Sequence, residues 1–197
     1  MTESTRLADY LLYLAYLTKK LDGFFEKQSP YIFCKKGCSK CCENGEYPFS
    51  RLEYDFIMIG FSKLAPEVRE EILNKVKNIK EEKIKSGDEF TYECPFLINH
   101  ECSVYEFRGI ICRSFGLMSI NSEGLSKIPF CAFEGLNYSN VVEQDTKIIS
   151  TEKYKKLGEN IPEPLAFNVG YKFLTSKNIE ENFKIHFGDK KALIDWF

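Results

Sequence analysis

Apolar residues recur every three or four positions near the start of the chain, between Thr5 and Phe25. This spacing predicts an amphipathic helix that buries one side against a core. The residues that carry the pattern are Leu7, Leu11, Leu14, Leu17, Leu21 and Phe24.

The same period returns twice, each time after a helix-start signal. Ser50 followed by Glu53 fits a capping box, in which the two side chains bond each other's backbone N–H groups, and predicts a helix that runs to Phe61. Pro66 is typical of a first helical position. It opens a second helix, with an apolar stripe opposite many lysine and glutamate residues, that ends at residues 86–88.

The later segments are shorter. Alternating apolar residues on both sides of Gly124 predict a small β-hairpin over residues 117–128. Ser150 is a candidate cap for a helix over residues 151–157, and further helices are expected over residues 178–187 and 190–197, divided by Gly188. We therefore predict a mainly α fold with a small β-hairpin, in which helices flank an irregular cysteine-rich core. A single domain, residues 1–197, would have its metal-binding core at 30–135 and flanking helices at 1–29 and 136–197.

Charge and hydropathy narrow the classes of partner. The formal net charge is -2 and the pI about 5.9, without the basic face that nucleic-acid binding normally needs. The uncharged run from Tyr10 to Thr18 is too short to span a bilayer, and no signal peptide precedes it. We expect a cytoplasmic protein with no nucleic-acid or membrane partner, and a protein partner stays open.

The chain has eight cysteines, and all lie in two groups between residues 34 and 131. Cytoplasmic thiols stay reduced, so the cysteines indicate metal chemistry rather than disulfides. Two groups of four thiols suggest two tetrathiolate sites. Because adjacent side chains usually diverge, Cys41 and Cys42 need not serve the same site, and the division of the thiols stays open. The candidate ligands are Cys34, Cys38, Cys41, Cys42, Cys94, Cys102, Cys112 and Cys131.

These cysteines and their neighbours resemble the YkgJ-type cysteine-cluster family, which is described as a zinc- or iron-chelating domain with a CxxCxxCC signature. The resemblance covers residues 34–131 and includes the Cys94-Pro95 pair, the stretch from Cys102 to Arg108, and Cys112-Arg113. Three residues separate Cys34 from Cys38 where the signature has two, and Gly109 stands where proline is common.

The resemblance implies metal chelation. In one branch of the family it also implies a flagellin lysine N-methylase that uses S-adenosylmethionine. The chain has no glycine-rich loop after a strand that would hold S-adenosylmethionine in a doubly wound sheet.

The choice of metal rests on ligand spacing. Cys34, Cys38 and Cys41 with one distant cysteine match the arrangement that iron–sulfur clusters favour, and the other four thiols fit zinc equally well. Iron–sulfur is our first choice by a small margin. A dication held by four thiolates carries a charge of about -2 and needs nearby cations. Arg113, which follows Cys112, is the candidate cofactor-binding residue for this role.

Three functions remain open on the sequence. The first is a metal-binding protein for electron transfer, redox sensing or metal handling. The second is an enzyme, either a protein-modifying methylase or a non-haem iron oxidoreductase with an open metal position. The third is a zinc-stapled interaction module without chemistry of its own. No catalytic residue is assigned, because no nucleophile, base and orienting group stand in a known motif.

Overall fold

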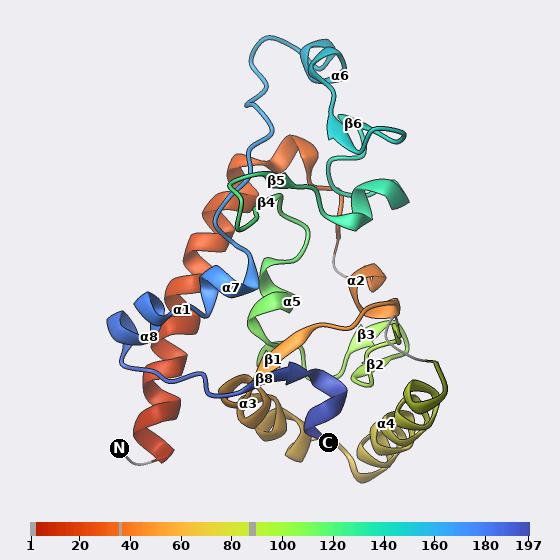
Figure 1. Ribbon diagram of the computed structural model, residues 1–197, viewed down its shortest axis with the longest axis vertical. Coiled ribbons are helices and arrows are strands. Elements are labelled where there is room, and N and C mark those ends of the chain that lie inside the picture. Colours follow the sequence, from red (N-terminus) through yellow and green to blue (C-terminus); the bar gives the residue numbers. More distant parts are fainter. Residues whose placement is uncertain (1–2, 36, 87–89) are drawn as a thin grey trace.

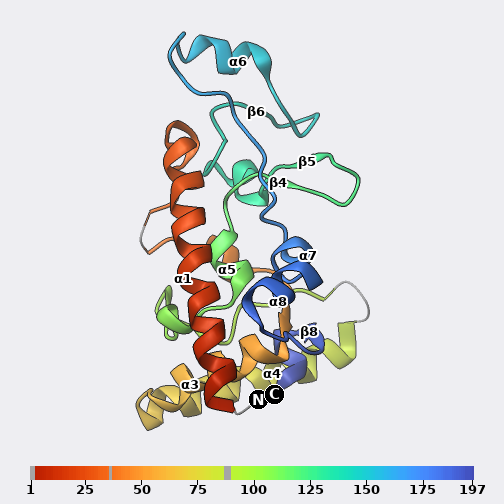
Figure 2. The ribbon, with the colours of Figure 1, turned by 90° about the vertical axis from the view of Figure 1, so that its left-hand side faces the viewer.

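The computed structural model describes residues 3–35, 37–86 and 90–197. Helix α1 (Glu3–Lys27) runs along much of the length of the molecule (Figures 1 and 2). Helices α3 (Arg51–Ser62) and α4 (Pro66–Ser86) lie at the end where the C-terminus is found, and α6 (Thr151–Lys156) lies at the opposite end. No helix in these ranges combines the length and apolar character needed to cross a membrane.

The three long helices confirm the periodic patterns. In α1, Leu14, Leu17 and Leu21 are buried, but Leu11 on the predicted stripe is exposed. Tyr10 and Tyr13 occupy the buried face in its place. The capping box at the start of α3 is present, and α4 begins at Pro66 as expected. The predicted end of α4 falls partly on residues 87–88, which lie outside the described ranges.

Short helical turns connect the longer elements. They include η1 (Ser29–Tyr31), α2 (Lys40–Glu43), η3 (Phe130–Glu134), α7 (Tyr171–Leu174) and α8 (Lys177–Phe183). The predicted helix after Ser150 is α6, and the Ser150 side chain accepts a hydrogen bond from the Lys153 N–H. The division of the chain into a core at 30–135 and two flanks stays a prediction.

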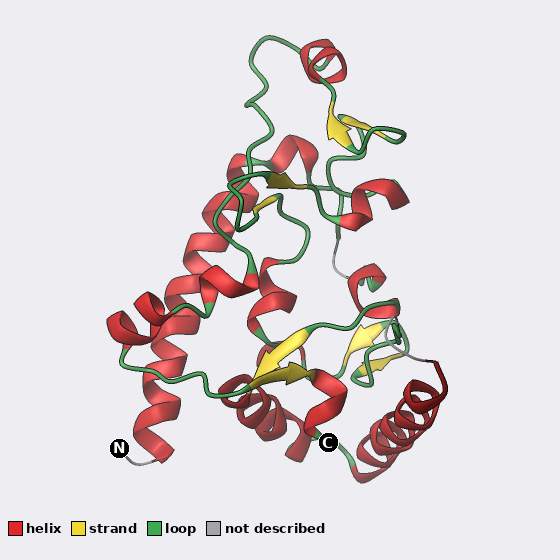
Figure 3. Ribbon diagram, in the orientation of Figure 1, coloured by secondary structure: helices red, strands yellow, loops and turns green. Residues whose placement is uncertain are grey.

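Strands are short and form two-stranded antiparallel sheets (Figure 3). The predicted hairpin is present as β4 (Ser119–Ile120) and β5 (Ser126–Lys127). The fold is mainly α with small hairpins, as predicted, and the described residues contain two hairpins besides the expected one. They are β2 (Leu97–Ile98) with β3 (Glu101–Cys102), and β6 (Val142–Glu143) with β7 (Ile148–Ile149).

The C-terminal segment differs most from the prediction. Helix α8 ends at Phe183 because Lys184 takes a left-handed conformation with φ 54°, so the expected helix over 178–187 is too long. Residues 190–197 are not an α-helix. Strand β8 (Lys190–Ala192) pairs with β1 (Pro48–Ser50), and the 3-10 helix η4 (Leu193–Trp196) follows. Tertiary pairing with β1 therefore overrides the local helical preference.

The segment that carries Cys112 is not one continuous helix. The 3-10 turn η2 (Tyr105–Phe107) and helix α5 (Ile110–Ser114) are separated at Gly109. A Cβ atom at Gly109 would lie 2.4 Å from the Phe49 ring, so only glycine allows this approach of the backbone to β1.

The Glu53 side chain is completely buried and ties three segments together. One carboxylate oxygen accepts the N–H of Ile110 at the start of α5, at 2.8 Å. The other accepts the Ser50 N–H and hydroxyl at 2.9 and 2.7 Å, and the Tyr171 hydroxyl at 2.6 Å. Glu53, which the sequence identifies as a capping residue, thus also holds the start of α5, the helix that carries Cys112.

The substitution Glu53→Ala should lower the free energy of unfolding by about 3 kcal/mol, because it leaves several buried donors without an acceptor. Urea unfolding followed by circular dichroism measures the effect. Asp55→Ala in the same helix is the control. Asp55 forms an exposed ion pair with Arg51, so its loss should cost less than about 0.5 kcal/mol. Equal losses in the two variants would contradict the proposed role of Glu53.

Candidate metal centre

All eight cysteines line one cavity of about 850 Å³, and so does Arg113. None of them forms a disulfide. The thiols come from the loop before α2, from α2 itself, from the β2–β3 region, from α5 and from η3. The fold therefore brings the two sequence groups of cysteines around one space.

The first group lies on a tight turn followed by α2. Gly37 has φ 90°, a left-handed geometry that glycine adopts without strain, and the Cys38 N–H bonds the Lys35 carbonyl at 2.9 Å. Cys41 and Cys42 are consecutive in α2, and their sulfurs lie 3.9 Å apart. The expectation that these neighbouring side chains diverge is therefore wrong, because both sulfurs turn toward each other.

The second group reaches the first through antiparallel backbone pairing. The Cys94 N–H donates to the Cys42 carbonyl at 2.7 Å, and the Gly45 N–H donates to the Tyr92 carbonyl at 3.1 Å. Gly45 and Tyr92 form an isolated β-bridge. This pairing places Cys42 beside Cys94 although about fifty residues separate them in sequence.

The β2–β3 hairpin returns the chain so that Cys102 faces the same region as Cys94. Asn99 and His100 occupy its two-residue turn with φ 50° and 63°, as a type I′ turn requires. Leu97 pairs with Cys102 across the hairpin, and the Leu97 N–H bonds the Cys94 carbonyl at 2.9 Å. This turn lies between Cys94 and Cys102 and reverses the chain direction.

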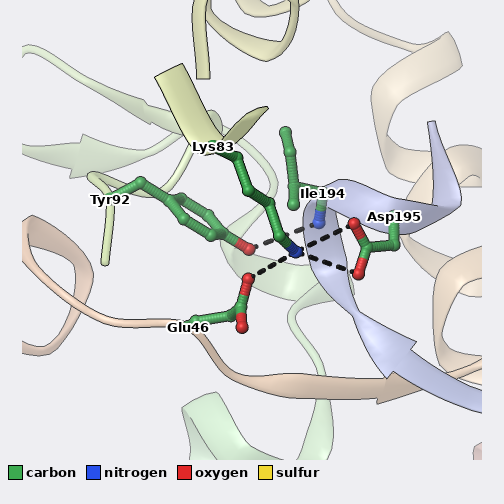
Figure 4. Close-up of polar contacts among 5 residues, drawn as sticks. All are labelled: Glu46, Lys83, Tyr92, Ile194 and Asp195. Carbon is green, nitrogen blue, oxygen red and sulfur yellow. Dashed lines mark hydrogen bonds and ion pairs between the residues drawn. The ribbon is translucent and has the colours of Figure 1, made fainter. Parts of the chain in front are cut away.

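An ionic clamp holds these segments against the C-terminus (Figure 4). The Lys83 ammonium group lies 2.8 Å from a Glu46 carboxylate oxygen and 3.0 Å from one of Asp195. Beside it, the Tyr92 hydroxyl accepts the Ile194 N–H at 3.3 Å. Glu46 follows Cys42 and Tyr92 precedes Cys94, so the clamp braces both cysteine-bearing segments.

The substitution Lys83→Met should lower the free energy of unfolding by about 1 kcal/mol at low salt, since the three groups are partly exposed. The loss should shrink as salt rises, because ions screen the pairs that wild type retains. Urea unfolding at two salt concentrations measures both effects. Lys156→Met removes an exposed pair with Glu152 away from the cavity and should change stability less. A loss of unfolding free energy that does not change with salt would show that the ion pairs of Lys83 are not its cause.

Asn137 joins the segments of Cys34 and Cys131. Its side-chain oxygen accepts the N–H groups of Phe33 and Cys34 at 2.8 and 2.7 Å, and its amide nitrogen donates to the Gly116 carbonyl at 3.0 Å. Asn137 is fully buried and follows η3, which carries Cys131. The sequence gives no signal for this residue, because an isolated asparagine after the last cysteine belongs to no motif.

The substitution Asn137→Ala should cost about 2 kcal/mol of unfolding free energy, because two partly buried N–H groups and the Gly116 carbonyl lose their partner. It should also make the Cys34 thiol react faster with a thiol reagent such as 5,5′-dithiobis(2-nitrobenzoic acid). Asn182→Ala, which removes an exposed contact with Asn178, is the matched control. Unchanged stability and unchanged Cys34 reactivity would show that Asn137 does not hold the segments of Cys34 and Cys131 together.

The electrostatics of the cavity couple thiol ionisation to cation binding. Burial raises the pKa of the Cys34 and Cys94 thiols to about 12, and that of Cys131 to about 11. Contact with Cys42 lowers the pKa of Cys41. Because most of these thiols must lose a proton to bind a cation, metal affinity should rise with pH.

Two arginines bring positive charge to the thiols. The Arg113 guanidinium bonds the carbonyls of Arg108 and Glu106 at 3.1 and 2.9 Å, and burial lowers its pKa. Arg108 also lines the cavity and stacks on the Tyr105 ring at 3.7 Å. Burial raises the pKa of the Cys102 thiol, and the charge of Arg108 opposes this shift. Sequence reasoning selected Arg113 as the cationic group and missed the electrostatic role of Arg108.

The donor set suits a metal, but the thiols are spread around the cavity. Thiolates are the usual ligands of structural zinc and of iron–sulfur clusters, so the residues fit either group. Within the ranges that the structure describes, no three Cys, His, Asp or Glu side chains meet at a single ion-binding point. His100 lines the cavity from the hairpin turn.

Comparison with known families decides the family of the chain. Residues 33–132 match the family model CxxCxxCC, "Putative zinc- or iron-chelating domain". The chain belongs to the CxxCxxCC family. No curated protein and no solved structure matches the chain. The family description supports a metal-binding role for the cysteine cluster.

The chain departs from the CxxCxxCC spacing by one residue between Cys34 and Cys38. The left-handed turn at Gly37 accommodates that residue, since the Cys38 N–H bonds back to the Lys35 carbonyl. Cys38 therefore still lines the cavity with the rest of the CxxCxxCC cysteines.

Proposed function

We propose that this chain is a metal-binding protein whose thiols hold iron–sulfur clusters for electron transfer or redox sensing. The observation that carries the proposal is the arrangement of eight free thiols around one cavity of about 850 Å³. Within the described ranges, no three of these thiols meet at one ion-binding point. Four sulfurs around one zinc ion would lie about 3.8 Å apart, from a Zn–S distance of about 2.3 Å. In a [4Fe–4S] cluster each thiolate binds a different iron atom, so wider spacing suits such a cluster better.

Zinc is the second candidate, and one distance favours it. The Cys41 and Cys42 sulfurs lie 3.9 Å apart, close to the spacing around a single tetrahedral ion. A zinc-loaded protein would use the metal to stabilise the fold, and its function would then depend on the protein surface.

Metal analysis separates the two candidates. Anaerobically purified protein should contain iron and acid-labile sulfide, with a broad visible absorption that bleaches on reduction. Iron, zinc, sulfide and protein are quantified on the same sample. Colourless protein with about two zinc ions and no sulfide, as two tetrathiolate sites would hold, would overturn the iron–sulfur proposal.

The variants Cys38→Ser and Cys112→Ser test metal binding for either metal. Each should lower the metal content by about half, because a four-thiolate site loses one ligand. Each should also lower stability, since metal binding contributes to folding. Ser126→Ala, in an exposed strand of the β4–β5 hairpin, is the control. Unchanged metal content in both cysteine variants would exclude these residues as essential ligands.

A further inference from the structure

The eight thiols form two spatial groups that cut across their order in the sequence. We infer that an inner group (Cys42, Cys94, Cys102 and Cys112) and an outer group (Cys34, Cys38, Cys41 and Cys131) form separate metal sites, and that the outer site exchanges its metal with solvent. The inference rests on the proposed metal binding but does not depend on which metal is bound.

Backbone hydrogen bonds define the inner group. The Cys94 N–H donates to the Cys42 carbonyl, and the Cys94 carbonyl accepts the Leu97 N–H. Leu97 in turn pairs with Cys102 across the hairpin. This chain of contacts links three of the four inner cysteines through neighbouring backbone.

Core packing adds Cys112 and encloses the inner group. Cys94, Cys102 and Cys112 all pack against one buried apolar cluster, which α3 and α4 form with Phe96 and Val104. The C-terminal Leu193 belongs to the same cluster, and the Lys83 clamp holds the neighbouring backbone. This packing covers the inner thiols on one side, so a metal held there should be released more slowly than one beside the exposed Cys34.

Asn137 defines the outer group. It accepts the Cys34 N–H at 2.7 Å, and the Leu136 N–H beside it bonds the Cys131 carbonyl at 3.0 Å. The turn at Gly37 then returns the chain from Cys34 to Cys38. Asn137 therefore brings together the two ends of the cysteine region, which carry Cys34 and Cys131.

Exposure distinguishes one cysteine of the outer group. Cys34 is exposed, whereas the other seven cysteines are half-buried or buried. Cys131 is buried and gives the outer group a fixed ligand. A chelator can reach the outer site through Cys34 without unfolding the chain, so exchange should be much faster there than at the inner site.

The Cys41–Cys42 pair marks the boundary between the groups. Cys42 belongs to the inner group through its backbone bond with Cys94, and Cys41 supplies the fourth ligand of the outer group. Their sulfurs are 3.9 Å apart, so the two sites adjoin.

Chelator competition tests the inference on the anaerobically purified full chain. Zinc loss is followed with 4-(2-pyridylazo)resorcinol, and loss of ferrous iron with ferrozine. Wild-type protein should lose about half its metal in a fast phase and the remainder in a slow phase. Iodoacetamide labelling after the fast phase, read by peptide mass spectrometry, should modify the outer cysteines and spare the inner four. A single phase, or equal labelling of both groups, would overturn the inference.

Two matched variants assign the phases. Cys34→Ser should halve the metal content and remove the fast phase, and the variant should fold because Cys34 is exposed. Cys102→Ser should halve the metal content and remove the slow phase. If Cys102→Ser does not fold, Cys34→Ser alone still tests the division into two sites. Complete loss of metal from Cys34→Ser, or loss of its slow phase, would contradict that division. Wild-type protein without any metal would instead overturn the proposed function.

Discussion

The hydrogen bond from the Cys94 N–H to the Cys42 carbonyl is the contact on which the candidate centre depends. It joins two stretches of chain that no extended sheet connects. The neighbouring Gly45–Tyr92 bridge prolongs the pairing, and the Lys83 clamp fixes both stretches to the C-terminal segment. Because β8 pairs with β1 directly before α3, the last residues of the chain also brace the cysteine region.

Single buried polar side chains hold together segments that a larger β-sheet would connect in other folds. Glu53 accepts hydrogen bonds from three segments, and Asn137 holds three backbone groups. Each buried donor or acceptor costs free energy when its partner is lost, so such residues specify one arrangement of otherwise irregular loops. They position the cysteines without contributing ligands themselves.

The sequence predicts those parts of the fold that depend on local pattern. The apolar period of α1, the capping box of Ser50 and Glu53, and Pro66 each predict a helix that the structure contains. The turn between Cys94 and Cys102 is predictable for the same reason. Residues 190–197 are not, because strand β8 depends on a partner strand more than a hundred residues away.

The candidate site shows the same limit. All eight cysteines could be selected from spacing alone, and the structure places all of them around one cavity. Their spatial neighbours could not be selected, because Cys42 meets Cys94 and Cys34 approaches Cys131 only through tertiary contacts. Asn137 and Arg108 act through position. Asn137 belongs to no motif, and the stretch from Cys102 to Arg108 resembles the family without indicating that Arg108 opposes the burial-driven rise in the pKa of the Cys102 thiol.

The two thiol groups close loops of very different length. Cys42 and Cys94 enclose about fifty residues, whereas Cys34 and Cys131 enclose nearly a hundred. Closing the longer loop costs more chain entropy, and long-range contacts form more slowly than local ones. During folding the inner group should therefore assemble first, while the outer group forms only when Asn137 docks on the segment of Phe33 and Cys34. On the proposed division of the thiols, a nascent chain would hold one metal before its second site exists.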